Sequence, residues 1–231
     1  MSAIDADLER RILFEDNHLL AINKKAGEII QGDKTGDEAL NERIKKFLQK
    51  KYNKPGDAFL GIVHRLDRPT SGVVIFAKTS KGASRLSAQF REKEISKTYW
   101  AITSVKPQSD SGTLQHYLKK NPKNNKSSAR PLPSDDRKQA VLDYELIKES
   151  DRYFLLEVKP VTGRHHQIRV QLAAEGMPIK GDLKYGFDRS NKDGSISLHA
   201  RSITFKHPTS KEEITLKAPV PEDKLWQFFE G

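Results

Sequence analysis

Cysteine is absent from the 231 residues of this chain. Disulfide bonds, thiolate nucleophiles and cysteine-ligated zinc sites are therefore excluded. Two further features are missing. The N-terminal segment MSAIDADLERRILFEDNHLL has no apolar core of a signal peptide, and no apolar run approaches the length of a membrane-spanning helix. We therefore expect a protein of the reducing cytoplasm with no membrane partner.

Acidic side chains are fewer than basic ones, with 31 Asp and Glu against 41 Lys and Arg, which gives a net charge of +10. This excess favours a polyanionic partner, although charge alone can simply keep a protein in solution. Hydrophobic residues make up only 35% of the chain, but they recur in periodic runs that can build a core. Nucleic acid is thus the first candidate for a partner.

The periodicity predicts more strands than helices, with several strands joined by short turns. We expect strands at residues 12–14, 19–22, 62–63, 73–77, 96–103, 139–147, 152–160, 196–205 and 212–217. We expect helices at 37–51, 80–92, 165–175 and 221–229, with Ser80 as the N-cap of the second. This mixture predicts an α+β fold with a mixed β-sheet rather than a doubly wound parallel sheet. G-x-G-x-x-G and P-loop motifs are absent, which argues against a nucleotide cofactor.

No internal repeat or break in composition divides the chain, so we expect a single domain over residues 1–231. Residues 106–137 are rich in Pro, Ser, Asn and Lys and poor in apolar side chains. We interpret this segment as an exposed basic excursion from the core.

The segment HRLDRPTSG, residues 64–72, places one carboxylate among arginines in a turn between two apolar runs. Asp67 has Arg65 and Arg68 nearby, and their positive charge favours the ionised carboxylate. An ionised carboxylate held in such a turn can act as a nucleophile or a base. The alternative is structural, either an ion pair or an aspartate that caps its own turn.

A second polar cluster lies in VTGRHHQIRVQL, residues 161–172, where a glycine turn leads into a predicted helix. It contains Arg164, His165, His166, Gln167 and Arg169. Free backbone N–H groups at a helix start suit a phosphate. Arg169 lies between apolar residues, so we expect it to be partly buried and to need a carboxylate, for which Asp67 is a candidate. Adjacent histidines do not share a helix face, so we expect no metal site.

Tyr99, in the strand-like segment KTYWAI, is the third candidate. A tyrosine in a strand commonly packs in the core with its hydroxyl satisfied. In a base-binding pocket it would instead stack on an unstacked base. The residues themselves leave both interpretations open.

Four motifs in order resemble the RluA-type pseudouridine synthases. HRLDRPTSGVVIFAKT resembles their H-R-L-D-x-x-T-S-G signature, and KTYWAI resembles their K-x-Y-x-A strand. GRHHQIRVQL with GMPIKGDLKYG resembles their G-R-x-H-Q-I-R-x-x-L and G-D-x-x-Y-G block. LHARSITFKHP resembles their late L-H-A segment, so that the resemblance covers roughly residues 11 to 217. Pro69 and His165 stand where the family commonly has other residues.

The resemblance implies a pseudouridine-synthase-like catalytic domain with a long mixed, mostly antiparallel β-sheet, flanking helices and a central RNA-binding cleft. It also implies that the domain isomerises uridine in rRNA or tRNA to pseudouridine. It implies that Asp67 is the catalytic carboxylate, that Tyr99 packs on the target base and that Arg169 pairs with Asp67. Arg65 would help to displace the target nucleotide. We expect the other RNA contacts from His64, Arg68, Arg164 and His166.

The implied reaction detaches uracil and rejoins it through C5, so it needs neither a metal nor a nucleotide cofactor. We expect a monomer without the separate S4 RNA-binding module that many relatives carry. Two rival functions remain at this point. One is a non-catalytic RNA-binding or assembly protein with the same fold, and the other is a metal-dependent phosphoesterase that uses Asp67, His64 and the histidine pair.

Overall fold

The computed structural model describes residues 3–32, 36–53, 55–56 and 58–231. Contacts divide the chain into two compact units. Unit 1 comprises Met1–Ser96 and Ala200–Pro219, and unit 2 comprises Lys97–His199 and Val220–Gly231. Because the chain passes between the units three times, neither unit is one continuous segment. The single catalytic domain expected over residues 1–231 stays a prediction.

Unit 1 is built on antiparallel strands. The predicted hairpin forms from β1 (Ile12–Glu15) and β2 (Leu19–Lys24), and its turn is closed by the Asp16 carboxylate, which accepts from the backbone N–H groups of His18 and Leu19 at 2.8 and 2.6 Å. β2 and the short β3 (Gly61–Ile62) pair with β4 (Ser71–Ala77), and β10 (Leu198–Lys206) pairs with β11 (Glu213–Lys217). β4 is buried along its whole length, which explains its continuous apolar sequence.

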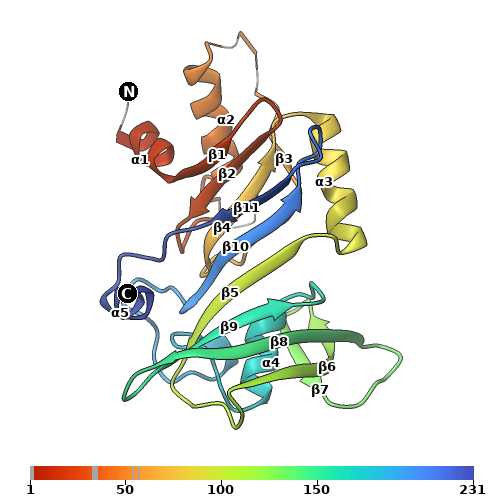
Figure 1. The fold of residues 1–231 in the computed structure, drawn as a ribbon, viewed down its shortest axis with the longest axis vertical. Helices are drawn as coiled ribbons and strands as arrows, with labels where there is room; N and C mark the ends of the chain where they lie inside the picture. Colours follow the sequence, from red (N-terminus) through yellow and green to blue (C-terminus); the bar gives the residue numbers. More distant parts are fainter. Residues whose placement is uncertain (1–2, 33–35, 54, 57) are drawn as a thin grey trace. The chain divides into compact units, whose positions relative to one another are not determined.

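The helices of unit 1 lie beside these strands (Figure 1). α1 (Ala3–Arg11), which the sequence analysis did not predict, and α2 (Leu40–Lys51) share one core cluster with β2 and β4. α2 buries the four apolar side chains that predicted it, namely Leu40, Ile44, Phe47 and Leu48. α3 (Ser80–Glu92) is also as predicted, but its N-cap is Thr79, whose hydroxyl accepts from the Gly82 N–H at 3.1 Å. The assignment of Ser80 as the cap was therefore wrong by one residue.

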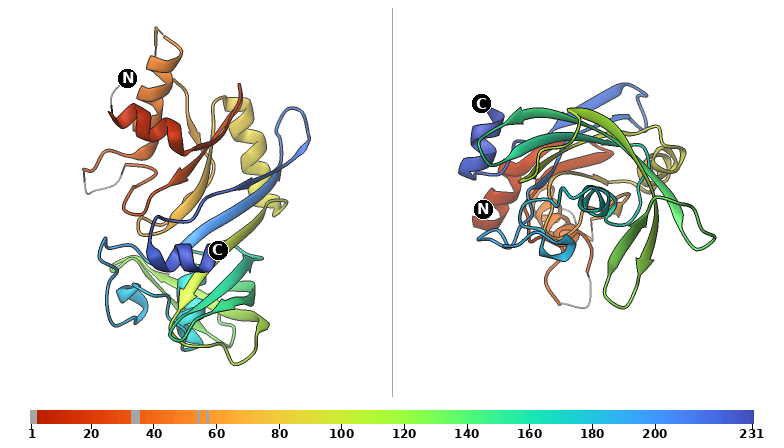
Figure 2. Two further views of the ribbon diagram at one scale, coloured as in Figure 1. Left: turned by 60° about the vertical axis from the view of Figure 1, so that its left-hand side comes forward. Right: turned by 90° about the horizontal axis from the view of Figure 1, so that it is seen from below.

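Unit 2 contains a second set of antiparallel strands, in the order β5, β9, β8, β6, β7. They are β5 (Ser96–Thr103), β9 (Phe154–Pro160), β8 (Lys138–Glu149), β6 (Ser111–Asn121) and β7 (Lys126–Arg130). α4 (Gln167–Ala174) packs on one face of these strands through Ile168 and Leu172 (Figure 2). The 3-10 turn η1 (Leu183–Tyr185) and α5 (Lys224–Glu230) complete the unit.

Residues 106–137 hold a β-hairpin, β6–β7, whereas their composition predicted only an exposed excursion. Much of the segment is exposed, as its composition indicates, but Leu114 and Leu118 are buried. Their alternation with polar side chains is the strand signal that the surrounding Lys, Asn and Pro residues obscured.

The α+β class and the extensive antiparallel strand pairing are confirmed. Within the described residues, no helix has the length and apolar character needed to cross a membrane.

Candidate active site

The segment between β3 and β4 carries Asp67. A tight turn closes it, in which the Thr70 N–H donates to the carbonyl of Asp67 at 3.0 Å. Asp67 itself is half-buried. The structure therefore confirms the turn between two strands that the sequence predicted.

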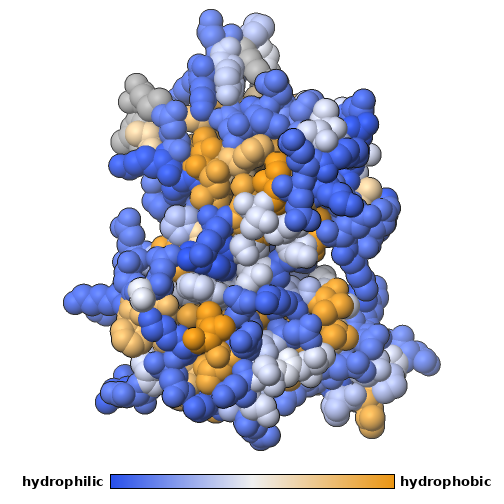
Figure 3. All heavy atoms as spheres, in the orientation of Figure 1, coloured by the Kyte–Doolittle hydropathy of each residue, from blue (hydrophilic) through white to orange (hydrophobic). Residues whose placement is uncertain are grey.

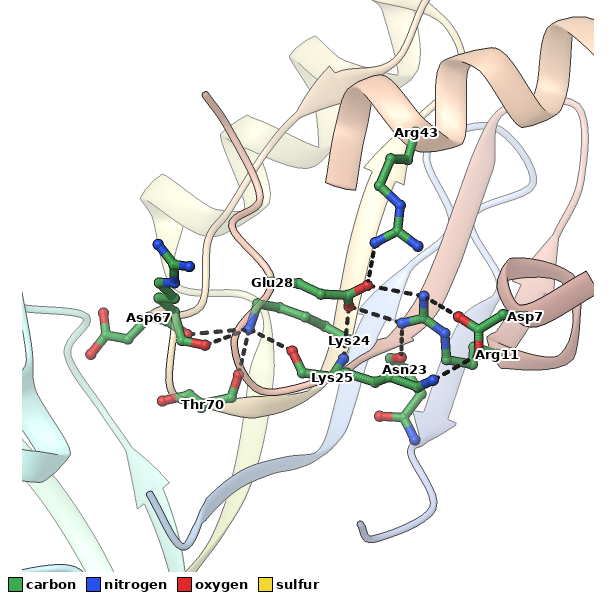
Figure 4. Close-up of polar contacts among 10 residues, drawn as sticks. Asp7, Arg11, Asn23, Lys24, Lys25, Glu28, Arg43, Asp67 and Thr70 are labelled. Carbon is green, nitrogen blue, oxygen red and sulfur yellow. Dashed lines mark hydrogen bonds and ion pairs between the residues drawn. The ribbon is translucent and has the colours of Figure 1, made fainter. Parts of the chain in front are cut away.

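A buried ammonium group holds the main chain of this turn (Figure 4). Lys24, at the end of β2, is 0% exposed. Its Nζ donates to the carbonyls of Thr70 at 2.6 Å, Lys25 at 3.0 Å, Arg68 at 3.2 Å and Asp67 at 3.3 Å. The Asp67 carboxylate points away from this ammonium group. Lys24 thus holds the main chain of the turn that carries Asp67 through hydrogen bonds.

An ion-pair network adjoins Lys24 in Figure 4. Glu28 accepts from Arg11 Nη1 and Nη2 at 2.9 and 3.0 Å and from Arg43 Nη1 at 2.8 Å. Burial pushes the pKa of Glu28 upward, but Arg11, Arg43 and the Lys25 N–H outweigh burial and hold that pKa below its ordinary value. Glu28 is therefore a fixed negative charge on the β2 side of the turn.

His64, Arg65 and Arg68 lie on the same segment but differ in their surroundings. His64 Nε2 accepts from the Ile75 N–H at 2.9 Å, and its ring stacks on Phe90 with centroids 4.8 Å apart. Arg65 is exposed and lines a pocket of about 440 Å³. Arg68 is exposed and pairs with Asp37 at 2.7 Å. Arg65 and Arg68 present their charge at the surface, whereas His64 also supports β4.

Arg169, on α4 in unit 2, is buried as the sequence predicted. Its Nε donates to Asp182 Oδ2 at 2.7 Å and its Nη2 donates to Asp182 Oδ1 at 2.9 Å. The guanidinium carbon lies 5.1 Å from the centroid of the Tyr185 ring. This two-point clamp and the ring beneath it leave the guanidinium little freedom to rotate. Neither Asp182 nor Tyr185 was predicted as a site residue, although both lie in the GDLKYG motif.

His165 and His166 are held in unit 2 by contacts with neighbouring residues. His166 has a left-handed backbone (φ 54°), is buried, and hydrogen-bonds through Nδ1 to the Tyr185 hydroxyl at 2.8 Å. The two imidazole rings stack with centroids 3.8 Å apart, and the His165 Nδ1 lies 2.9 Å from Ser127 Oγ on β7. His166 therefore helps to position Tyr185, a contact that the expected role in RNA binding did not anticipate. Groups of three His, Asp or Glu suited to a metal ion are not found in the described part of the chain.

Arg164 lies at the turn before α4 and is exposed. Its Nε donates to the Gln139 carbonyl at 3.0 Å, and its N–H donates to Gln167 Oε1 at 2.9 Å. Gln167 also accepts from the Thr162 hydroxyl at 2.7 Å and donates to the Val141 carbonyl at 3.0 Å. The glutamine thus ties the turn to β8 while Arg164 keeps its charge at the surface.

Tyr99 lies on β5, opposite Val158 of β9. It is half-buried and packs against the core of unit 2. Lys97 precedes it by two residues and so shares its face of the strand. Burial lowers the pKa of Lys97. A Cβ atom on Gly163 would stand 3.8 Å from Lys97 Nζ, so this cation lies beside the turn that leads into α4.

Asp67 belongs to unit 1, whereas Tyr99 and Arg169 belong to unit 2. The structure brings Arg169, His166, Asp182 and Tyr185 together within unit 2, and Lys24 with the Asp67 turn within unit 1. The expected pairing of Asp67 with Arg169 would join the units and stays a prediction.

A protein-family model described as RNA pseudouridylate synthase matches residues 18–174. Two relatives are named ribosomal large subunit pseudouridine synthase C. The one from Vibrio parahaemolyticus is 33% identical over 234 residues, which cover 98% of this chain and 70% of the relative. The one from Rickettsia prowazekii is 36% identical over 216 residues, which cover 91% and 68%.

Two solved structures share the fold. Human RNA Pseudouridylate Synthase Domain Containing 4 has a TM-score of 0.81 at 24% identity, over 98% of this chain and 94% of its own. Human RNA Pseudouridylate Synthase Domain Containing 1 has a TM-score of 0.74 at 24% identity, over 98% and 88%.

Proposed function

The chain belongs to the RNA pseudouridylate synthase family and is an isomerase, and on this premise we propose that it converts a specific uridine of rRNA, tRNA or both to pseudouridine. The relatives named for the ribosomal large subunit support rRNA as the first substrate to test. We propose Asp67 as the catalytic carboxylate.

The setting of Asp67 is the observation that carries this proposal. Asp67 is half-exposed, while a fully buried ammonium group holds its backbone carbonyl. A surface that only binds RNA gains nothing from an acid facing a polyanion, because like charges repel. An acid presented on a rigid turn is instead suited to react with the ribose of a bound nucleotide.

In the proposed mechanism, Asp67 either attacks C1′ of the target ribose or removes a proton from C2′. Both routes need the ionised carboxylate and break the N1–C1′ bond. The freed uracil turns and bonds to C1′ through C5, as the carboxylate leaves C1′ or returns its proton to C2′. The C5 proton is then lost and N1 gains one, so that no atom is gained or lost overall. The isomerisation has no net redox change, so we propose that it proceeds without a cofactor. Arg169 would reach Asp67 with Nη1, since the Asp182 carboxylate takes Nε and Nη2. The clamp by Asp182 would keep that guanidinium oriented before the substrate arrives.

The target base has to leave its stack before the acid can reach the sugar, which costs about a few kcal/mol. We propose that stacking on Tyr99 and insertion of Arg65 offset this cost. The exposed charges of Arg65, Arg68 and Arg164 would hold phosphates, while His64 and His166 would act through the segments they support. Figure 3 shows that hydrophilic residues cover much of one face, with hydrophobic patches between them. We further propose a cytoplasmic monomer.

The test is to map pseudouridines in total RNA from cells with and without this protein. We expect one or a few sites to disappear without it and to return when the gene is restored. The purified protein should then modify the same uridine in an unmodified transcript. Binding of that transcript without any pseudouridine formation would favour an RNA-binding protein that keeps the fold but not the reaction.

A further inference from the structure

The four carbonyls that accept hydrogen bonds from Lys24 Nζ lie in two short segments of the chain. Three of them, from Asp67, Arg68 and Thr70, belong to the turn that carries the acid, and the fourth is the carbonyl of Lys25. Lys24 is also paired directly with Gly72 across the β2–β4 ladder. Its backbone is therefore fixed to the start of β4, while its side chain reaches back along the preceding turn.

Such an ammonium group is costly to bury, because an ion loses its hydration in a protein interior. Main-chain carbonyls compensate by offering dipoles at 2.6 to 3.3 Å. Two of these carbonyls also accept a second hydrogen bond. The Arg68 carbonyl accepts from the Gly27 N–H at 2.8 Å, and the Asp67 carbonyl accepts from the Thr70 N–H at 3.0 Å. Several hydrogen-bond donors therefore fix the conformation of the turn, and the charged donor among them is Lys24.

We propose that Lys24 is a positioning residue for the reaction, whose ammonium group holds the Asp67–Thr70 main chain in the geometry from which the Asp67 carboxylate reacts. This inference rests on the proposed function. Lys24 need not touch the substrate, because its hydrogen bonds end on the backbone of the turn. Its effect should therefore appear in the rate of the chemical step more than in RNA affinity.

The charge state of Lys24 provides a test that a merely structural lysine would not meet. Burial lowers the pKa of Lys24 from 10.5 to about 8, while the charges of Glu28 and Asp67 raise it and those of Arg11 and Arg68 lower it further. As pH rises through this range, the neutral amine loses one donor and the attraction of a full charge for the carbonyls. The turn should loosen and the rate should fall.

Global unfolding should not accompany that fall. The pKa in the folded protein lies below the ordinary value of 10.5, so between these two values the unfolded chain binds more protons at this site. The contribution of Lys24 to the free energy of unfolding therefore rises with pH in this window. A loss of rate without a loss of stability distinguishes positioning from a general weakening of the fold.

The experiment measures single-turnover rates from pH 6 to 9.5 with enzyme in excess over a transcript that contains the target uridine. We expect the wild-type rate to fall above about pH 8. Glu28→Gln removes a charge that raises the pKa of Lys24. The rate of this variant should therefore begin to fall at a lower pH than that of the wild type. Because both proteins act on one RNA, ionisation of the RNA itself cancels in the comparison.

Lys24→Met should lower the rate by roughly 100-fold, as expected for a misplaced reacting group, and should lose the limb near pH 8. Lys46→Met is the matched control, since Lys46 is exposed and pairs with Glu38 at 2.6 Å, and its rate and pH profile should follow the wild type. Thermal unfolding of each variant accompanies the rates. Hydrogen exchange should show faster opening of residues 64–71 in Lys24→Met than in the control.

A wild-type rate and profile in Lys24→Met would overturn the inference while leaving the proposed function intact. If that variant does not fold, identical alkaline limbs in the wild type and Glu28→Gln would overturn it instead. A wild-type protein that forms no pseudouridine at any pH would contradict the proposed function.

Discussion

The carboxylate of Asp182 holds the guanidinium of Arg169 through two hydrogen bonds, Nε to Oδ2 at 2.7 Å and Nη2 to Oδ1 at 2.9 Å. Both side chains are buried, with exposures of 5% and 1%. This pair joins two motifs that stand apart in the sequence, GRHHQIRVQL and GDLKYG. Asp182 therefore orients the arginine that we propose as the partner of the catalytic acid.

Asp182→Ala should destabilise the protein by about 3–5 kcal/mol, because it removes the carboxylate that accepts two hydrogen bonds from the buried guanidinium of Arg169. Chemical denaturation measures the free energy of unfolding. Glu149→Ala is the control, since it removes an exposed pair with Lys106 and should cost no more than about 1 kcal/mol. Equal small losses in both variants would show that the Arg169–Asp182 pair contributes little.

Asp67→Asn should abolish turnover and leave RNA binding unchanged or slightly tighter. The amide keeps the shape of the side chain but can neither attack C1′ nor take a proton. A turnover assay and a binding titration on the same transcript measure the two effects. Measurable pseudouridine formation by the purified variant would remove Asp67 from its proposed role.

Tyr99→Phe should lower the rate less than Tyr99→Ala if the ring acts by stacking on the displaced base, a contact worth about 1–3 kcal/mol. The ratio of the two rates at saturating RNA measures the contribution of the ring. Equal losses in both variants would assign the effect to the hydroxyl. Because Tyr99 also packs against the core of unit 2, thermal unfolding must accompany the assay.

RNA affinity should fall steeply with salt, because phosphate contacts by lysine and arginine release counterions. With a net charge of +10 and exposed Arg65, Arg68 and Arg164, several such contacts are expected. The slope of log affinity against log salt reports their number, and Arg164→Ala should make it shallower by about one unit. A flat response would contradict an RNA surface based on charge.

Gly72→Ala should destabilise unit 1 by at least about 2 kcal/mol, through backbone strain and overpacking together. The φ of Gly72 is +116°, and a Cβ atom there would lie 2.8 Å from the carbonyl carbon of Ala200. Gly32→Ala is the control, because nothing lies within 4 Å of its Cβ position. Denaturant midpoints compare the two. A Gly72→Ala midpoint equal to that of the control would show that the backbone moves freely at this position.

Local patterns sufficed for most elements of the fold. The spacing of Leu40, Ile44, Phe47 and Leu48 predicted α2, and the continuous apolar run of β4 predicted a buried strand. Both signals lie within a few residues, where backbone geometry dictates which side chains share a face. The hairpin β6–β7 was missed because its buried positions are few and its polar residues many.

Such local patterns could not predict contacts between residues far apart in the sequence. Lys24 meets carbonyls that lie 43, 44 and 46 residues later, and no neighbour in the sequence marks it as buried. The burial of Arg169 was predicted from its apolar neighbours, but Asp182 lies 13 residues away on another turn.

By itself, the sequence determined the α+β class, the basic charge, the Asp67 turn and the resemblance that named a family. Only the tertiary structure decided which groups hold that turn and which carboxylate clamps Arg169. The reason is physical: periodicity and turn residues act over a few bonds, whereas a buried charge is satisfied by whatever donors and acceptors the folded chain brings within about 3 Å.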